Sequence, residues 1–302
     1  MAMNSFLGFS FMFILFTSVH GFSRNYPFSN FNQSFVPIFG DDHISSIDDQ
    51  GKSVQLSLDQ TTGCGFTSRN SYYHAYYSAS IKLPSNYSAG VVVTFYTSNS
   101  KYYVNNHDEL DFEFLGNIRS QDWVIQTNVY GNGSMNRGRE ERFSLGFDPT
   151  QDFHTYSILW VSNSIIFYID DIPIRETRRV DAMGGDFPSK PMSLYATIWD
   201  GSAWATGGGK YKIDYKYAPY IAKYKDFVLH GCSANPTQLP PKCDDSSSDM
   251  NATFDGLTNR ERLVMKSFRL KHLTYSYCRD PARYPTPLPE CVFDRQVARK
   301  RN

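Results

Sequence analysis

The most informative stretch of the sequence is His107-Asp108-Glu109-Leu110-Asp111-Phe112-Glu113-Phe114-Leu115-Gly116. Side chains alternate across a β-strand, so one face of this segment is acidic and includes His107, while the other face is apolar. The acidic face carries Glu109, Asp111 and Glu113. The apolar face carries Leu110, Phe112 and Phe114. Asp108 falls on the apolar side and needs a local partner there. The segment therefore predicts a strand with a buried face and a carboxylate-bearing face.

Short segments of strand character surround this one between about residues 50 and 230. Some alternate apolar and polar residues, and one, 91–96, is a continuous β-branched and aromatic run. The predicted strands cover 54–58, 77–83, 91–96, 107–115, 123–130, 154–161, 164–169, 192–198 and 221–229. No long helical period separates them, which argues against βαβ units. The pattern predicts an all-β, antiparallel sandwich or jelly roll over residues 22–230.

The composition changes after Gly231, where proline-rich and serine-rich stretches begin. Thr258 and Glu261 form a capping-box pattern, which predicts a helix from there to about Leu273. We interpret residues 231–302 as a C-terminal extension that docks on the sandwich, with one helix.

The first 21 residues have the pattern of a signal peptide, with an apolar run from Phe6 to Val19 and a cleavage point near Gly21. No Lys or Arg precedes the run, so an uncleaved anchor is the alternative, but the run is short for a bilayer span. Four sequons agree with secretion. Their asparagines are Asn32, Asn86, Asn132 and Asn251.

Four of the five cysteines lie in the last quarter of the chain, and Cys64 stands alone. The four are Cys232, Cys243, Cys278 and Cys291. In an oxidising compartment they predict two disulfides, for which three pairings are possible. The short sequence separations favour Cys232 with Cys243 and Cys278 with Cys291, which leaves Cys64 as a buried free thiol.

The overall composition excludes several classes of function. Thirty basic and 30 acidic residues give no net charge, so nothing indicates a nucleic-acid partner. No Cys or His spacing is typical of a metal site, and no later segment is apolar enough to cross a membrane. Aromatic residues make up 16% of the chain, which suits both β-strands and a sugar-binding cleft.

The three carboxylates of the central strand indicate acid–base chemistry. A solvated acidic face is the alternative, but Asp and Glu are depleted in strands and like charges repel. Crowded carboxylates raise one another's pKa, so one group stays protonated while a neighbour is ionised. Retaining cleavage of a glycosidic bond needs this pair, with carboxyl groups about 5–5.5 Å apart. Glu109 and Glu113, with Cα atoms about 13 Å apart, must lean together on a curved strand.

The motif His-Asp-Glu-Leu-Asp-Phe-Glu-Phe-Leu-Gly resembles the active-site strand of the xyloglucan endotransglucosylase/hydrolases, a branch of glycoside hydrolase family 16. The resemblance also covers segments 123–130, 139–143, 147–150, 187–188, 199–209 and 275–278. It implies a concave jelly roll, a C-terminal extension with two disulfides, and no metal or cofactor. It further implies that Glu109 is the nucleophile, Glu113 the acid/base and Asp111 the assisting carboxylate. Many relatives carry a sequon directly after this strand, but here Asn117-Ile118-Arg119 is not a sequon. The Asn132 sequon takes its place, as in a divergent plant subgroup.

The same resemblance implies a set of substrate contacts. These are Gln126, Thr127, Asn128, Gly138, Arg139, Glu140, Trp204, Ala205 and Gly209, with Tyr96, His107 and Arg283 as further candidates. For Gln126 and Asn128 a routine polar edge-strand face is the alternative. For Trp199, packing beneath the loop that Trp204 occupies is the alternative to a place in the cleft.

The function that follows from the resemblance is transglycosylation of xyloglucan, with one xyloglucan chain as donor and another as acceptor. A xyloglucan hydrolase with the same residues is the alternative, and a non-catalytic lectin ranks last because it has no use for the third carboxylate. We expect a monomer that is secreted to the plant cell wall and apoplast.

Overall fold

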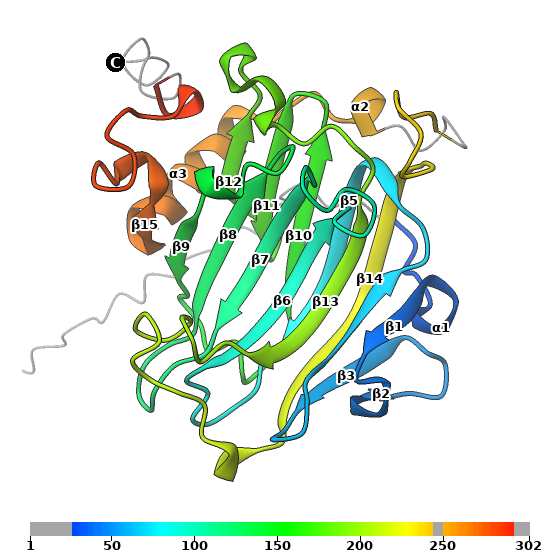
Figure 1. The fold of residues 1–302 in the computed structure, drawn as a ribbon, viewed down its shortest axis with the longest axis vertical. Helices are drawn as coiled ribbons and strands as arrows, with labels where there is room; N and C mark the ends of the chain where they lie inside the picture. The colour runs from blue at the N-terminus through cyan, green and yellow to red at the C-terminus, as the bar shows by residue number, and fades with distance from the viewer. Residues whose placement is uncertain (1–25, 244–249, 293–302) are drawn as a thin grey trace, which may run out of the picture.

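Two antiparallel β-sheets stacked face to face form the body of the computed structural model, which describes residues 26–243 and 250–292 (Figure 1). The predicted signal peptide, 1–21, lies outside the described residues. The first sheet runs in the order β1 (Phe35–Phe39), β4 (Cys64–Ser68), β13 (Ser193–Asp200), β6 (Val91–Ser98), β7 (Glu109–Leu115), β8 (Val124–Tyr130), β9 (Glu141–Ser144), β15 (Leu273–Ser276). The second runs β12 (Ile172–Arg178), β11 (Ser164–Ile169), β10 (His154–Val161), β5 (Tyr72–Lys82), β14 (Tyr220–Ser233), β3 (Ser53–Leu58), β2 (Ile44–Ser46). This architecture confirms the predicted all-β antiparallel sandwich.

The predicted strands agree with the observed ones where the apolar alternation is strong. Strands β10 and β11 have the predicted bounds, whereas β7 begins at Glu109, two residues later than predicted. Strand β12 was not predicted, because it lies at a sheet edge and Arg175 occupies one of its inward positions. The short strands β9 and β15 were also not predicted. Although they are far apart in the sequence, they pair with each other.

The apolar face of β7 packs between the sheets, as its sequence predicts. Leu110, Phe112 and Phe114 are fully buried. The Phe112 ring contacts Phe167 of β11 edge-on with centroids 5.2 Å apart, and the Phe114 ring contacts Tyr156 of β10 at 4.7 Å. Edge-to-face contacts of this kind add to the hydrophobic gain from burial. The position of β7 within the first sheet is therefore fixed from its inner face.

Asp108, at the start of β7, has the local partner that the sequence requires. Its carboxylate accepts hydrogen bonds from the Lys190 ammonium at 2.7 Å and from the backbone N–H groups of Asn132, Ser189 and Lys190 at 2.7–2.8 Å. A fully buried carboxylate is tolerated only with such compensation. Asp108 thus joins the loops that follow β8 and precede β13 to the beginning of the carboxylate strand.

The C-terminal extension is continuous with the sandwich. Strand β14 runs through the predicted boundary at residue 231 to Ser233, and β15 of the extension pairs with β9 at the edge of the first sheet. The helix α3 (Asn259–His272) begins with the predicted capping box, in which Thr258 and Glu261 bond each other's backbone N–H groups. Two further short helices are α1 (Phe31–Ser34) and α2 (Met250–Thr253). The predicted helix is confirmed.

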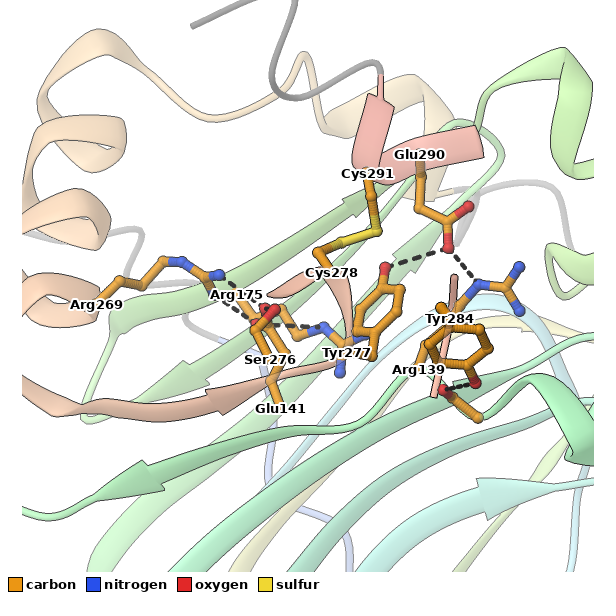
Figure 2. Close-up of a disulfide and its surroundings, with 11 residues drawn as sticks. Arg139, Glu141, Arg175, Arg269, Ser276, Tyr277, Cys278, Tyr284, Glu290 and Cys291 are labelled. Carbon is orange, nitrogen blue, oxygen red and sulfur yellow. Dashed lines mark hydrogen bonds and ion pairs between the residues drawn. A yellow bond between two sulfur atoms is a disulfide. The ribbon is translucent and has the colours of Figure 1, made fainter. Parts of the chain in front are cut away.

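Two disulfides lie in this part of the molecule. Cys232 is joined to Cys243 and Cys278 to Cys291, with Cα–Cα distances of 5.1 Å and 5.4 Å. Figure 2 shows the second bond beside Tyr277 and Glu290. Cys64 is a free thiol, and burial raises its pKa to about 12. The thiol is therefore neutral and unreactive at physiological pH.

Removing the bond between Cys278 and Cys291 should lower the free energy of unfolding. The bond spans 13 residues of sequence, and closing a loop of that size stabilises a fold by about 3 kcal/mol. We expect Cys278→Ala/Cys291→Ala to lower the free energy of unfolding by about that amount, so the variant should unfold at a lower urea concentration than the parent. An unchanged midpoint, with both disulfides of the parent verified by non-reducing peptide mapping, would contradict this expectation.

The sequon asparagines differ in their surroundings. Asn32, Asn86, Asn132 and Asn251 are all exposed, but they differ in the contacts of their side chains. The Asn251 carboxamide is used by the fold, because its Oδ1 accepts from the Ser162 N–H at 2.7 Å and its Nδ2 contacts His74 Nδ1 at 2.8 Å. A glycan would be attached to this same nitrogen, which keeps one N–H after modification, so glycosylation at Asn251, as at the other three sequons, stays a prediction.

Candidate active site

A cleft of about 590 Å³ lies on the outer face of the first sheet, on the side opposite the core. It crosses β13, β6, β7 and β8, which are adjacent in the middle of the sheet. Its lining residues are Phe39, Thr94, Tyr96, Glu109, Asp111, Glu113, Gln126, Asn128, Tyr130, Met135, Glu140, Thr197, Trp199 and Trp204. The acidic face of β7 therefore forms the floor of the cleft.

Cross-strand register arranges the floor in three rows. Each carboxylate of β7 lies between one residue of β6 and one of β8. The rows are Ser98–Glu109–Tyr130, Tyr96–Asp111–Asn128 and Thr94–Glu113–Gln126. A strand of period two thus aims all three carboxyl groups into one cleft.

Glu109 retains a partly exposed side chain, with 23% of its surface accessible in the cleft. Burial in the cleft raises the pKa of its carboxyl group, while a hydrogen bond from Ser98 and the proximity of His107 act in the opposite direction. His107 Nε2 lies 3.9 Å from Glu109 Oε2, and His107 itself is 7% exposed. His107 therefore lies beside Glu109 and is not among the residues that line the cleft.

Asp111 is the most enclosed of the three carboxyl groups, with 6% of its surface exposed. Burial raises its pKa well above the usual range, and the neighbouring carboxylates of Glu109 and Glu113 raise it further. Because three charges in a row are unfavourable, the protonated form of Asp111 is favoured.

Glu113 has the electrostatics of a general acid. Burial raises the pKa of its carboxyl group to about 7, a hydrogen bond from Gln126 lowers it, and Glu140 and Glu109 raise it. The amide Nε2 of Gln126 donates to Glu113 Oε2 at 2.5 Å. A carboxyl group with this pKa can both give and accept a proton near neutral pH.

Several of the predicted substrate contacts line the cleft. They are Tyr96, Gln126, Asn128, Glu140 and Trp204. Trp199 also lines it, so packing beneath the loop, which the sequence left open for Trp199, does not describe its position. On β13 the side chains alternate, and Trp199 lies on the same face as Tyr195 and Thr197.

Thr127 does not point into the cleft. It lies between Gln126 and Asn128 on β8, so its side chain faces the core, where it is fully buried and accepts a hydrogen bond from Arg175 at 2.9 Å. Because side chains alternate along a strand, the three consecutive residues Gln126, Thr127 and Asn128 cannot all face the cleft.

The Arg139 side chain is also placed away from the cleft. Its guanidinium is fully buried and donates to Glu290 at 2.5 Å (Figure 2) and to Asp186 at 2.9 Å. Gly138 is buried beside it, and a Cβ at this position would lie 2.8 Å from the Arg283 guanidinium. Arg139 therefore joins the C-terminal extension to the sandwich and offers no guanidinium to a ligand in the cleft.

The remaining predicted contacts lie at the margin of the cleft. Arg283 forms a two-pronged pair with Glu140, at 2.7 Å and 3.1 Å. Ala205 and Gly209 shape the loop that carries Trp204, where Gly209 has a φ of +83° and a Cβ would collide with the Ala203 carbonyl oxygen. These three residues border the cleft without lining it.

The sequence analysis did not propose five of the lining residues. They are Phe39, Thr94, Tyr130, Met135 and Thr197. Extending the period of two from Tyr96 and Asn128 would have found Thr94 and Tyr130. No local pattern indicates Phe39, which reaches the cleft from the edge strand β1.

Comparison with known proteins identifies the family. Residues 31–217 match glycosyl hydrolases family 16, and residues 244–291 match the C-terminus of xyloglucan endo-transglycosylase. A protein of Arabidopsis thaliana described as probable xyloglucan endotransglucosylase/hydrolase protein 27 is 54% identical over 96% of this chain and 87% of its own length. The chain belongs to the xyloglucan endotransglucosylase/hydrolase family. Members of this family are glycosidases and transglycosylases, and the chain is an enzyme of this type.

Other similarities agree with this membership. Probable xyloglucan endotransglucosylase/hydrolase protein 30 of the same plant is 55% identical over 87% of the chain and 77% of its own length. Among solved structures, the β-glucanase of Bacillus licheniformis shares the fold, with a TM-score of 0.54 and 24% identity over 68% of this chain and 96% of that chain. The family resemblance inferred from the β7 motif is thus confirmed.

The described residues contain no cluster of three or more His, Cys, Asp or Glu side chains that could hold a metal ion. In the same residues no helix is long and apolar enough to cross a bilayer.

Proposed function

We propose that this enzyme cuts xyloglucan and transfers the cut end to a second xyloglucan chain by a retaining mechanism. The observation that carries the proposal is the row of three carboxyl groups with different electrostatics on the floor of the cleft. The names of the relatives supply the substrate class. We further propose that the enzyme acts as a secreted monomer in the cell wall.

In the first half-reaction the ionised Glu109 attacks the anomeric carbon of a backbone glucose. The C–O bond to the leaving chain breaks as Glu113 delivers its proton to that oxygen, and an ester between the sugar and Glu109 remains. In the second half-reaction Glu113, now ionised, removes a proton from an acceptor hydroxyl. That oxygen attacks the anomeric carbon and releases Glu109, so two inversions give overall retention.

Asp111 assists between these two groups. Burial and the neighbouring carboxylates raise its pKa and so favour its protonated form, which can donate a hydrogen bond to the Glu109 carboxylate beside it. Donation of this kind disperses the charge that returns to Glu109 when the glycosyl ester breaks. A neutral Asp111 also removes one of three repelling charges.

The walls of the cleft suit a polysaccharide. Tyr96, Trp199 and Trp204 present aromatic surface, and apolar faces of glucose rings stack on such surfaces. The Tyr96 ring is held by stacking on Tyr195, with centroids 5.1 Å apart. A rigid platform of this kind orients the sugar over the carboxyl groups at low entropic cost.

Transfer and hydrolysis differ only in which oxygen reaches the intermediate. Water is present at about 55 M, and an oriented acceptor can reach effective molarities of about 10⁵ M or more. Purified enzyme should be given xyloglucan with a labelled xyloglucan oligosaccharide. We expect label to enter polymer faster than reducing ends accumulate. If reducing ends dominate at saturating acceptor, the enzyme is a hydrolase with the same residues.

The pH dependence of kcat/KM should reflect the two carboxyl groups in opposite protonation states. Glu109 must be ionised, so activity rises with pH through its raised pKa. Glu113 must be protonated for the first half-reaction, so activity falls as pH rises through about 7. A bell-shaped profile is expected, and its basic limb should vanish for a donor whose leaving group needs no proton. A limb that persists with such a donor would assign it to another group.

A further inference from the structure

Arg142 stands at the end of a row of polar side chains that crosses three adjacent strands. In register, Glu113 of β7 lies opposite Gln126 of β8, and Gln126 lies opposite Arg142 of β9. The Gln126 Nε2 donates to Glu113 Oε2 at 2.5 Å, and Arg142 Nε donates to Gln126 Oε1 at 2.7 Å. The three side chains therefore form one continuous hydrogen-bonded chain that ends on the acid/base.

The hydrogen bond from Arg142 determines the orientation of the Gln126 amide. A guanidinium can only donate, so the group that faces it must be the amide oxygen. The amide NH₂ then faces Glu113, and because an NH₂ group can only donate, Glu113 Oε2 must accept. In the protonated state of Glu113 the proton consequently resides on the other oxygen, Oε1.

We propose that Arg142 is a positioning residue which, through Gln126, fixes the carboxyl oxygen of Glu113 that carries the catalytic proton. This inference rests on the proposed role of Glu113 as acid/base. Without Arg142 the amide of Gln126 can rotate and offer its oxygen to Glu113. Glu113 would then place its proton on Oε2, against Gln126, where a glycosidic oxygen cannot receive it.

Arg142 is in turn held by the C-terminal extension. In register it lies opposite Tyr275 of β15, and its guanidinium carbon is 5.1 Å from the centre of that ring. A cation above an aromatic face is stabilised by the ring. The Tyr275 hydroxyl donates to Asp280 at 2.9 Å, which fixes the ring. The extension thereby contacts the acid/base through two intermediate side chains.

The charges around Glu113 give the sign of the expected pH effect. The titratable groups that act on it or face it are Glu109 and Asp111 of β7, Tyr130 of β8, Glu140 and Arg142. Arg142 and the hydrogen bond from Gln126 both lower the pKa of Glu113, against the effect of burial. Removing Arg142 weakens both influences, so the pKa of Glu113 must rise and the basic limb of the profile must move to higher pH.

The test compares two donors that share one xyloglucan oligosaccharide and differ in leaving group. One carries a natural glucosyl leaving group, and the other carries dinitrophenolate, which departs without a proton. For Arg142→Met we expect kcat/KM to fall about tenfold with the natural donor, a part of the 10²–10⁴-fold that general acid catalysis supplies. With the aryl donor kcat/KM should be unchanged. Arg142→Lys, which keeps a cationic donor, should recover most of the loss.

Arg142 is 43% exposed at its side chain, so Arg142→Met opens no cavity in the core. Arg69→Met, at an exposed arginine whose side chain makes a 3.5 Å contact with the Asn32 carbonyl, is the matched control and should retain parent activity on both donors. Gln126→Glu provides a second variant, because its carboxylate offers Glu113 an acceptor in place of a donor. Its kcat/KM with the natural donor should fall at least as far as that of Arg142→Met.

A substrate-independent measurement separates this inference from the proposed function. Titration of ¹³C-labelled glutamate, with the Glu113 signal assigned by Glu113→Gln, should show a higher pKa in Arg142→Met than in the parent. An unchanged pKa, an equal loss with both donors or no loss with the natural donor overturns the role of Arg142. If the parent cleaves neither donor, the proposed function fails, and the titration alone then decides the role of Arg142.

Discussion

Glu109→Ala should lose about 10⁴-fold or more in turnover of xyloglucan while its fold and unfolding midpoint stay close to those of the parent. The side chain lies in the cleft, on the face of β7 opposite the core, so its truncation removes the nucleophile and leaves the packing between the sheets intact. A small anion such as azide or formate can then enter the vacated space and attack the anomeric carbon. The rescued product should have the inverted configuration, because only one displacement occurs.

Asp152→Ala is the matched control for this experiment, since Asp152 is an exposed carboxylate outside the cleft. It should retain parent activity and show no response to azide. Near-normal turnover in Glu109→Ala would show that another group is the nucleophile. A rescued product with retained configuration would show that the added anion does not act by a single displacement.

Arg139→Met should destabilise the enzyme by about 3–5 kcal/mol, the usual cost of breaking a buried ion pair from one side. The Arg139 side chain is fully buried, and Glu290 is 6% exposed at its side chain. Loss of the guanidinium leaves the Glu290 carboxylate without a cation, with only the Tyr277 hydroxyl donating to it at 3.1 Å. Asp186 is affected less because it keeps its pair with Arg137 at 2.6 Å. Urea unfolding measures the loss directly.

The double variant Arg139→Met/Glu290→Met distinguishes a stranded charge from lost packing. If the cost arises from the unpaired carboxylate, removing that carboxylate as well should restore stability to within about 1–2 kcal/mol of the parent. If the double variant loses as much stability as the two single variants lose together, this account is contradicted. They would indicate that the shapes of the two side chains, and not their charges, hold the extension in place.

The features that the sequence predicted well are local ones. The alternation in β7 depends on neighbouring residues alone, and it correctly placed Phe112 in the core and the three carboxyl groups on one face. The need of Asp108 for a partner was also evident from that alternation. The identity of the partner was not, because Lys190 is 82 residues away in the sequence.

The errors at the site have two different causes. Thr127 was grouped with its neighbours by resemblance, although the period of two already places it on the opposite face. The interior position of Arg139 could not be inferred in that way, since it depends on Glu290, 151 residues later. Contacts between the sandwich and its extension are long-range, and a single sequence contains no periodic signal for them.

The most direct test of the proposed mechanism is to capture the glycosyl-enzyme. Enzyme mixed with a xyloglucan oligosaccharide donor is quenched in acid within one turnover, digested with pepsin and analysed by mass spectrometry. The account predicts one glycosyl group, attached through an ester to Glu109, in the peptide that contains β7. An adduct on Asp111 or Glu113, or the absence of any adduct together with an inverted product, would contradict it.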